Sequence, residues 1–263
     1  MEKRTDKNSY TILFAVIMVV VVGALLAFTA SSLKPNITEN QRLEKQQNIL
    51  YAMGINDNDE SNAIFISTDK APEAFKSNIK DQLVITIDSN GKIIKTQTRD
   101  EYVAETKQEP YLIDVKKEQA NAKQGQPRKL PLFVGERDGK TYYVAPIYGK
   151  GLWDAIWGYV ALDKDMVVQG AYFDHKGETP GLGANIKQRY FMDDFEGEHL
   201  LSESGVFKGI TVAKGNADPK NTDKTDNAVD AIAGATITGD GVTAMIKSDL
   251  KLYKPYFDTL KNN

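Results

Sequence analysis

An uninterrupted apolar stretch near the N-terminus most constrains what this chain can fold into. No charged residue occurs from Tyr10 to Ala30, and Ile12–Val22 is almost wholly aliphatic. About 20 such residues in a helix, rising about 1.5 Å each, cross a bilayer core of about 30 Å. A cleaved signal peptide usually has a shorter apolar core of about 7–15 residues, and Thr29–Ser32 is only a loose cleavage site. We therefore predict one transmembrane helix over residues 10–30.

The charges before this stretch predict its orientation. Residues 1–9 form a short polar tail that carries the basic residues Lys3, Arg4 and Lys7. Basic tails tend to stay in the cytoplasm, whereas long domains cross the membrane largely regardless of their charge. We expect a cytoplasmic tail over residues 1–9 and an extracytoplasmic C-terminal part.

Composition narrows the chemistry that the chain can perform. It has 263 residues, no cysteine, two histidines and a formal net charge of −3. Without cysteine there is no disulfide, thiolate nucleophile or cysteine-ligated iron–sulfur cluster, and two separated histidines argue against a histidine-rich metal site. The balanced charge argues against nucleic acid as a partner. Redox chemistry would need an added organic cofactor.

Residues 31–80 are predicted to form a membrane-proximal helical segment. Asn36 and Glu39 are spaced as a capping box, which predicts that a helix begins there. Gly54 suits the position just after the helix end, where a left-handed residue is common. A second short helix is expected from Ala71 to Phe75.

Three apolar–turn–apolar patterns predict β-hairpins, with turns at residues 89–91, 137–139 and 163–165. Two of these turns contain Asn-Gly or Asp-Gly, which favours tight hairpins. The natural assembly is an α+β domain over residues 81–263, in which helices pack on a twisted antiparallel sheet. A further strand is expected over residues 207–212 and a helix over residues 184–191.

The stretch Asp230–Gly241 places two threonines, Thr236 and Thr238, after a Gly234-Ala235 pair. Apolar residues at helical spacing follow, so the turn lies before an amphipathic helix. The N-terminus of a helix offers unpaired N–H groups and a positive dipole end, which favour a phosphate. The alternative is an ordinary helix N-cap, supplied by Thr238 or Asp240.

Two glycine-bearing loops interrupt the sheet pattern, at Tyr148–Trp153 and at Glu178–Gly183. Both could be tight turns, with Trp153 and Trp157 in the core. Glu178 fits that interpretation poorly, because a carboxylate among small and apolar residues usually needs a partner.

These motifs carry a family resemblance. The residues Asp-x-x-Ala-Gly-Ala-Thr-x-Thr at 230–238 resemble the flavinylation motif of FMN-binding domains, with Ala233 in place of the usual Ser or Thr. Together with the N-terminal span, Tyr-Gly-x-Gly-Leu-Trp and Glu-Thr-Pro-Gly-Leu-Gly, the chain is similar to the C subunits of the Na⁺-translocating NADH:quinone reductase, the Nqr complex. The resemblance covers nearly the whole chain.

The resemblance implies a covalent FMN, held by a phosphoester bond to Thr238 and attached by a flavin transferase that uses FAD. The chain would then be one subunit of an NADH:ubiquinone oxidoreductase and relay electrons towards the flavin of the B subunit and ubiquinone. From the residues themselves we assign no catalytic residue and no metal ligand on this chain. The expected cofactor-binding residues are Thr238, Thr236, Ala235, Gly234, Glu178, Thr179, Leu182 and Gly183.

The implied location is the inner membrane, with a single span in contact with lipid and the large domain on the periplasmic side. The implied partners are the other Nqr subunits, especially B, D and E. Two alternatives stay open: a subunit like the G subunit of the Rnf complex, and a cofactor-free, membrane-tethered assembly domain. A secreted enzyme has little support, because no nucleophile–base set can be named.

Overall fold

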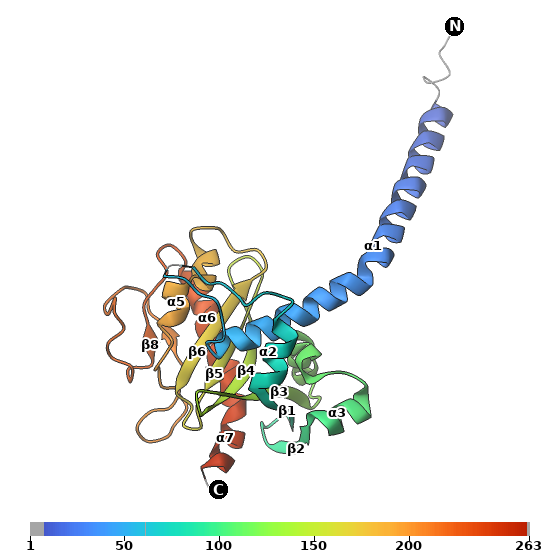
Figure 1. Ribbon diagram of the computed structural model, residues 1–263. Coiled ribbons are helices and arrows are strands. Elements are labelled where there is room, and N and C mark those ends of the chain that lie inside the picture. The colour runs from blue at the N-terminus through green and yellow to red at the C-terminus, as the bar shows by residue number, and fades with distance from the viewer. Residues whose placement is uncertain (1–7, 61, 262–263) are drawn as a thin grey trace. The chain divides into compact units, whose positions relative to one another are not determined.

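The computed structural model describes residues 8–60 and 62–261 (Figure 1). Most of the predicted tail, residues 1–7, lies outside the described residues. The chain divides into two compact units, Met1–Leu43 and Glu44–Asn263, and helix α1 (Asn8–Ala52) contains the boundary between them. Each unit is described by itself.

The first unit is helical and apolar. Within the described residues, α1 is the one helix long and apolar enough to cross a membrane, with a mean hydropathy of 3.0 in its most apolar window. That window is not buried against any other part of the protein. The helix is therefore consistent with a single membrane anchor, as predicted for residues 10–30.

The prediction that a helix begins at Asn36 is wrong. α1 runs through Pro35 without ending, and Glu39 accepts a hydrogen bond from Arg42 Nε at 2.9 Å instead of capping Asn36. A proline removes one backbone hydrogen bond, whereas the turns on either side of it keep theirs. The hydroxyl of Thr38 also donates to the Lys34 carbonyl at 3.0 Å.

The helix end was predicted correctly. Gly54 has φ +74°, and the N–H of Ile55 donates to the Leu50 carbonyl at 2.9 Å, which is the bond of a Schellman C-cap.

The second unit is built on a six-stranded antiparallel sheet with strand order β2-β1-β3-β4-β5-β6. The three predicted hairpins are its β1–β2, β3–β4 and β5–β6 pairs. At the β3–β4 turn, Asp138 and Gly139 both have positive φ, as a two-residue hairpin turn requires. The strands are β1 (Ile79–Ile87), β2 (Ile93–Thr98), β3 (Arg128–Arg137), β4 (Lys140–Lys150), β5 (Ala155–Leu162) and β6 (Val168–His175).

Helices cover both faces of this sheet (Figure 1). On β4, a Cβ at Gly149 would touch Met245 of α6; on β3, a Cβ at Gly135 would touch Met53 at the end of α1. Gly135 pairs with Tyr142 of β4, so these two residues face the same side of the sheet. Tyr142 and Gly149 are an odd number of residues apart on β4, so they face opposite sides. The two helices therefore lie on opposite faces. The helices of this unit, besides the end of α1, are α2 (Ala71–Asn78), α3 (Arg99–Thr106), α4 (Val115–Lys123), α5 (Arg189–Asp193), α6 (Thr236–Asp249) and α7 (Lys254–Leu260).

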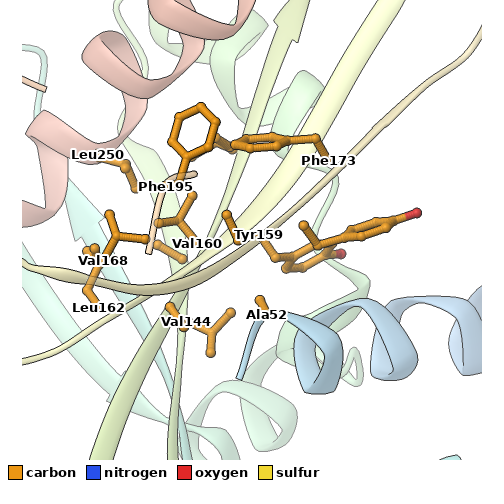
Figure 2. Packing of buried hydrophobic residues seen from close by; sticks show 14 of the residues in the cluster. Ala52, Val144, Tyr159, Val160, Leu162, Val168, Phe173, Phe195 and Leu250 are labelled. Carbon is orange, nitrogen blue, oxygen red and sulfur yellow. The ribbon is translucent and has the colours of Figure 1, made fainter. Parts of the chain in front are cut away.

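Buried side chains from the sheet, the end of α1, α2, α5, α6 and α7 form one large core, and Tyr102 of α3 packs in a separate small cluster with Val84 and Ile113. Figure 2 shows Phe173 of β6 beside Phe195, with ring centroids 4.9 Å apart, and Ala52 near the buried strand residues. The α+β class with an antiparallel sheet, predicted from the hairpin patterns, is confirmed.

Two smaller predictions need correction. The helix expected over 184–191 is a 3₁₀ turn (Gly183–Lys187) and then α5, because Gln188 between them is extended (φ −80°, ψ 145°). The strand expected over 207–212 is reduced to β7 (Thr211–Val212), which pairs in parallel with β8 (Ala228–Val229) outside the main sheet.

Candidate functional site

Helix α6 begins at Thr236, earlier than the N-cap interpretation required. The N-cap position is held by Ala235, which has no side-chain oxygen, and Gly234 before it has φ +70°. Thr238 is therefore inside the first turn and is not a cap. The first N–H groups of a helix have no partner within it, so this end can bind an anion such as a phosphate.

The Glu178–Gly183 loop lies directly against Thr238. The Thr238 hydroxyl donates a hydrogen bond to Oε2 of Glu178 at 2.6 Å, and the two residues are only 2% and 4% exposed. A Cβ at Gly183 would lie 2.4 Å from Thr238 Oγ1 and 2.5 Å from Glu178 Oε2. Only glycine allows the loop to approach the hydroxyl this closely.

A second loop holds the other oxygen of Glu178. Oε1 accepts hydrogen bonds from the backbone N–H groups of Trp153 at 2.9 Å and Asp154 at 3.5 Å. Burial raises the pKa of Glu178, but the hydrogen bonds from the Thr238 hydroxyl and from the 152–154 backbone outweigh it, so the pKa lies below its usual value. The carboxylate is ionised at neutral pH, and this loop supplies the partner that the sequence left unidentified.

The surface around Thr238 is apolar and exposed. Trp153 is 66% exposed, and its indole N–H donates to the Thr179 hydroxyl at 3.1 Å. Leu182 packs against Gly234, where an added Cβ would lie 2.8 Å from its Cδ2. Exposed apolar groups that gather beside an anion site mark a ligand surface more often than single exposed residues do. The exposed members are Leu152, Trp153, Leu182 and Ile237.

A groove of about 950 Å³ begins at Trp153 and runs between α4, β4 and α6. This volume is in the range of small-molecule and cofactor sites. Basic side chains on its wall include Lys116, Lys123 and Lys150. Its acidic residues Asp249 and Asp154 are paired with Arg128 at 2.9 Å and Lys176 at 3.0 Å. Trp153 therefore lies between the Thr238 surface and a groove with a basic wall.

The structure brings most of the predicted cofactor-binding residues together. Thr238, Glu178 and Gly183 are in direct contact, and Gly234 packs on Leu182. Ala235 is the N-cap residue of α6, and Thr236, the first residue of the helix, is exposed.

Two residues at the site were missed or misplaced. A Cβ at Gly151 would lie 2.6 Å from Glu178 Oε1, so this glycine is needed next to the carboxylate. Trp153 was considered a core residue and is exposed, and Trp157 is only partly buried. The signal for both was the Tyr-Gly-x-Gly-Leu-Trp loop, because glycines beside an aromatic residue favour a close approach to another group.

Comparison with known proteins agrees with this geometry. Residues 151–251 match the family model of the FMN-binding domain, a range that contains Gly151, Glu178 and Thr238. This part of the chain is therefore similar to FMN-binding domains, and it follows one long apolar N-terminal helix.

Its relatives define the resemblance further. The C subunit of the Na⁺-translocating NADH-quinone reductase of Yersinia pestis is 29% identical over 246 residues, covering 91% of this chain and 87% of that protein. The same subunit from Pseudomonas aeruginosa is 29% identical over 247 residues, covering 92% and 90%. The crystal structure of the C subunit from Parabacteroides distasonis superposes with a TM-score of 0.66 at 28% identity, covering 86% of this chain and 96% of that one. The predicted resemblance is confirmed: over most of its length the chain is similar to C subunits of this reductase, an oxidoreductase complex.

Proposed function

We propose that this chain is the FMN-carrying subunit of a Na⁺-translocating NADH:ubiquinone reductase, with the FMN joined by a phosphoester bond to Oγ1 of Thr238. The observation that carries the proposal is the Thr238 hydroxyl itself. It lies in the uncapped first turn of α6 and is hydrogen-bonded to the buried carboxylate of Glu178. The match of residues 151–251 to the FMN-binding domain supports the same assignment.

The residues of this chain would hold and orient the cofactor. The first N–H groups of α6 favour the phosphate, and Gly234 lets the turn approach it. Trp153 and Leu182 would provide the apolar walls for the ring, with Thr179 fixing the Trp153 indole. The bound FMN supplies the one- and two-electron redox chemistry, and the covalent bond prevents its loss between turnovers.

The assignment carries partners and a location with it. The chain would pass electrons to the flavin of the B subunit, on the way to ubiquinone, while the complex exports sodium. Its other partners would be the D and E subunits, and a flavin transferase during maturation. The single span would anchor it in the inner membrane, with the FMN-binding domain on the periplasmic side.

The test is covalent loading of the full-length chain, co-expressed with a flavin transferase. Wild type, Thr238→Ala and Thr236→Ala are compared by in-gel flavin fluorescence and intact mass. We expect wild type and Thr236→Ala to be heavier by one FMN less one water, and Thr238→Ala to be dark and unmodified. Thr236 is the matched control because it is exposed and two residues away.

Two other results would change the proposal. Fluorescence that persists in Thr238→Ala and disappears in Thr236→Ala would move the acceptor to Thr236. A dark wild-type band, from a transferase shown to be active on another substrate, would overturn the covalent flavin and leave the cofactor-free, membrane-tethered assembly domain.

A further inference from the structure

The position of Glu178 conflicts with a phosphate at the same site. The carboxylate is 4% exposed, and its Oε2 lies 2.6 Å from the oxygen that would carry the phosphorus. A phosphodiester on Thr238 would bear a negative charge beside a buried negative carboxylate. Like charges this close, screened little by water, strongly raise the pKa of one partner. The conflict disappears if Glu178 is neutral in the loaded protein.

Glu178 is also oriented as a proton acceptor. Its Oε1 is held by the backbone N–H groups of Trp153 and Asp154, which leaves Oε2 directed at the Thr238 hydroxyl. Gly151 lies against Oε1 and Gly183 against Oε2 of Glu178. Because neither residue has a side chain, both carboxylate oxygens can reach their hydrogen-bond donors. A short, aligned hydrogen bond between a hydroxyl and a carboxylate is the arrangement that activates a weak nucleophile.

We propose that Glu178 takes the proton of Thr238 during flavin attachment and keeps it afterwards, as a neutral acid that donates a hydrogen bond to the phosphoester. The inference rests on the proposed function, because it assumes that Thr238 is the acceptor. It assigns to Glu178 a role in the attachment step in addition to contact with the bound cofactor.

The step balances with a flavin dinucleotide as the donor. A bond forms between Thr238 Oγ1 and the phosphorus on the FMN side of the pyrophosphate. The bond from that phosphorus to the bridging oxygen breaks, and AMP leaves with this oxygen. The proton of Thr238 passes to Glu178 Oε2, so the carboxylate becomes a carboxylic acid and no electrons are gained or lost.

Before attachment the carboxylate must be charged, and the structure provides for this. The hydrogen bonds from Thr238 and from the 152–154 backbone lower the pKa of Glu178. Formation of the ester removes the hydroxyl donor and adds a negative charge, and both changes raise that pKa. Attachment therefore changes the favoured form of Glu178 from the carboxylate to the neutral carboxylic acid.

The first experiment measures the rate of FMN attachment in full-length Glu178→Gln, by intact mass over time with purified transferase and FAD. Glutamine keeps the size of the side chain and can donate to the ester, but it cannot take the proton. We expect attachment to slow by about 100-fold or more. The matched control is Glu198→Gln, a second buried glutamate that bonds Asn221 at 3.0 Å and is expected to load at the wild-type rate.

A purely structural role makes a different prediction for this variant. The Thr238 side chain is 2% exposed, so the Glu178–Gly183 loop must shift before phosphorus reaches it. Glutamine accepts a weaker hydrogen bond than a carboxylate does, so it would ease that shift. Attachment at the wild-type rate or faster would overturn the proposal.

The second experiment needs no variant for its main result, so it stands even if Glu178→Gln fails to fold. Infrared difference spectra compare loaded and unloaded wild-type protein in the carboxylic-acid C=O region. We expect a new acid band on loading, shifted in D₂O and absent when Thr238→Ala is treated in the same way. Loaded protein with no acid band would overturn the proposal while the proposed function stands; wild type that never loads would overturn both.

Discussion

The surroundings of individual residues set their ionisation states in this protein. Glu198, which lies outside the Thr238 site, is an example. Its side chain is fully buried, with Oε1 bonded to Asn221, and burial raises its pKa to about 7. The folded state therefore binds this proton more tightly than the unfolded chain, in which a glutamate titrates near pH 4.3. Glu178, with several donors, has the opposite shift.

Glu198 predicts a loss of stability as pH rises. The stability that protonated Glu198 contributes is fully present below the unfolded pKa and is lost as pH rises from there through about 7. Over that range the unfolded chain ionises this group while the folded state keeps it protonated. We expect wild type to lose up to about 3 kcal/mol of unfolding free energy between pH 5 and pH 8 through this group. Glu198→Gln should lack that part of the pH dependence.

Urea unfolding of both proteins at the two pH values measures this difference. The exposed Glu203→Gln is the control and should follow wild type. An equal pH dependence in wild type and Glu198→Gln would contradict the assignment.

At the scale of elements, one buried ion pair joins the helix that carries Thr238 to the sheet. Asp249, at the end of α6, accepts hydrogen bonds from Arg128 of β3 at 2.9 Å and from the N–H of Tyr148 of β4 at 2.9 Å. The Gln119 amide of α4 donates to the same carboxylate at 3.0 Å. A negative charge at a helix C-terminus is unfavourable by itself, so these donors explain its presence. They position α6, and with it the Thr238 turn.

Removal of this carboxylate should be costly. Asp249→Ala leaves the Arg128 guanidinium buried without its partner, and we expect a loss of about 3–5 kcal/mol of unfolding free energy. The control is Lys261→Ala, which breaks an exposed pair with Asp165 and should cost less than about 1 kcal/mol. Chemical denaturation of the three proteins compares them directly, and equal losses in the two variants would contradict this role for Asp249.

At the scale of the whole molecule, the two compact units differ in whether their apolar side chains are exposed or buried. The first unit is an exposed apolar helix, whereas the second has a core of its own and begins at Glu44. Buried side chains such as Ile49 and Leu50 belong to the core of the second unit, although they lie on the same helix as the apolar stretch. The apolar stretch and the second unit are thus joined by one continuous helix, α1.

We expect a chain that begins at Glu44 to be soluble without detergent, and the full-length chain to fractionate with membranes. The apolar window of α1 buries nothing within the protein, so removing it exposes no core. Fractionation of cell lysates measures this, with an added protease on intact spheroplasts to test the proposed periplasmic side. A truncated chain that stays with membranes would contradict a single anchor.

The features that the sequence determined are local ones. An apolar run of 21 charge-free residues, Asp138-Gly139 between two β patterns, and Gly54 after a helix all act through neighbouring residues, so they could be identified without tertiary contacts. The threonine motif also belongs to this group, because its resemblance to a family is carried by nine consecutive residues.

Tertiary structure decided what those features meet. It brought Glu178 to Thr238 across 60 residues of chain, and it left Trp153 exposed. It also began α6 at Thr236. Local patterns cannot predict these results, because each depends on which groups approach from distant segments. The chemistry of Thr238 therefore depends on the fold as well as on its motif.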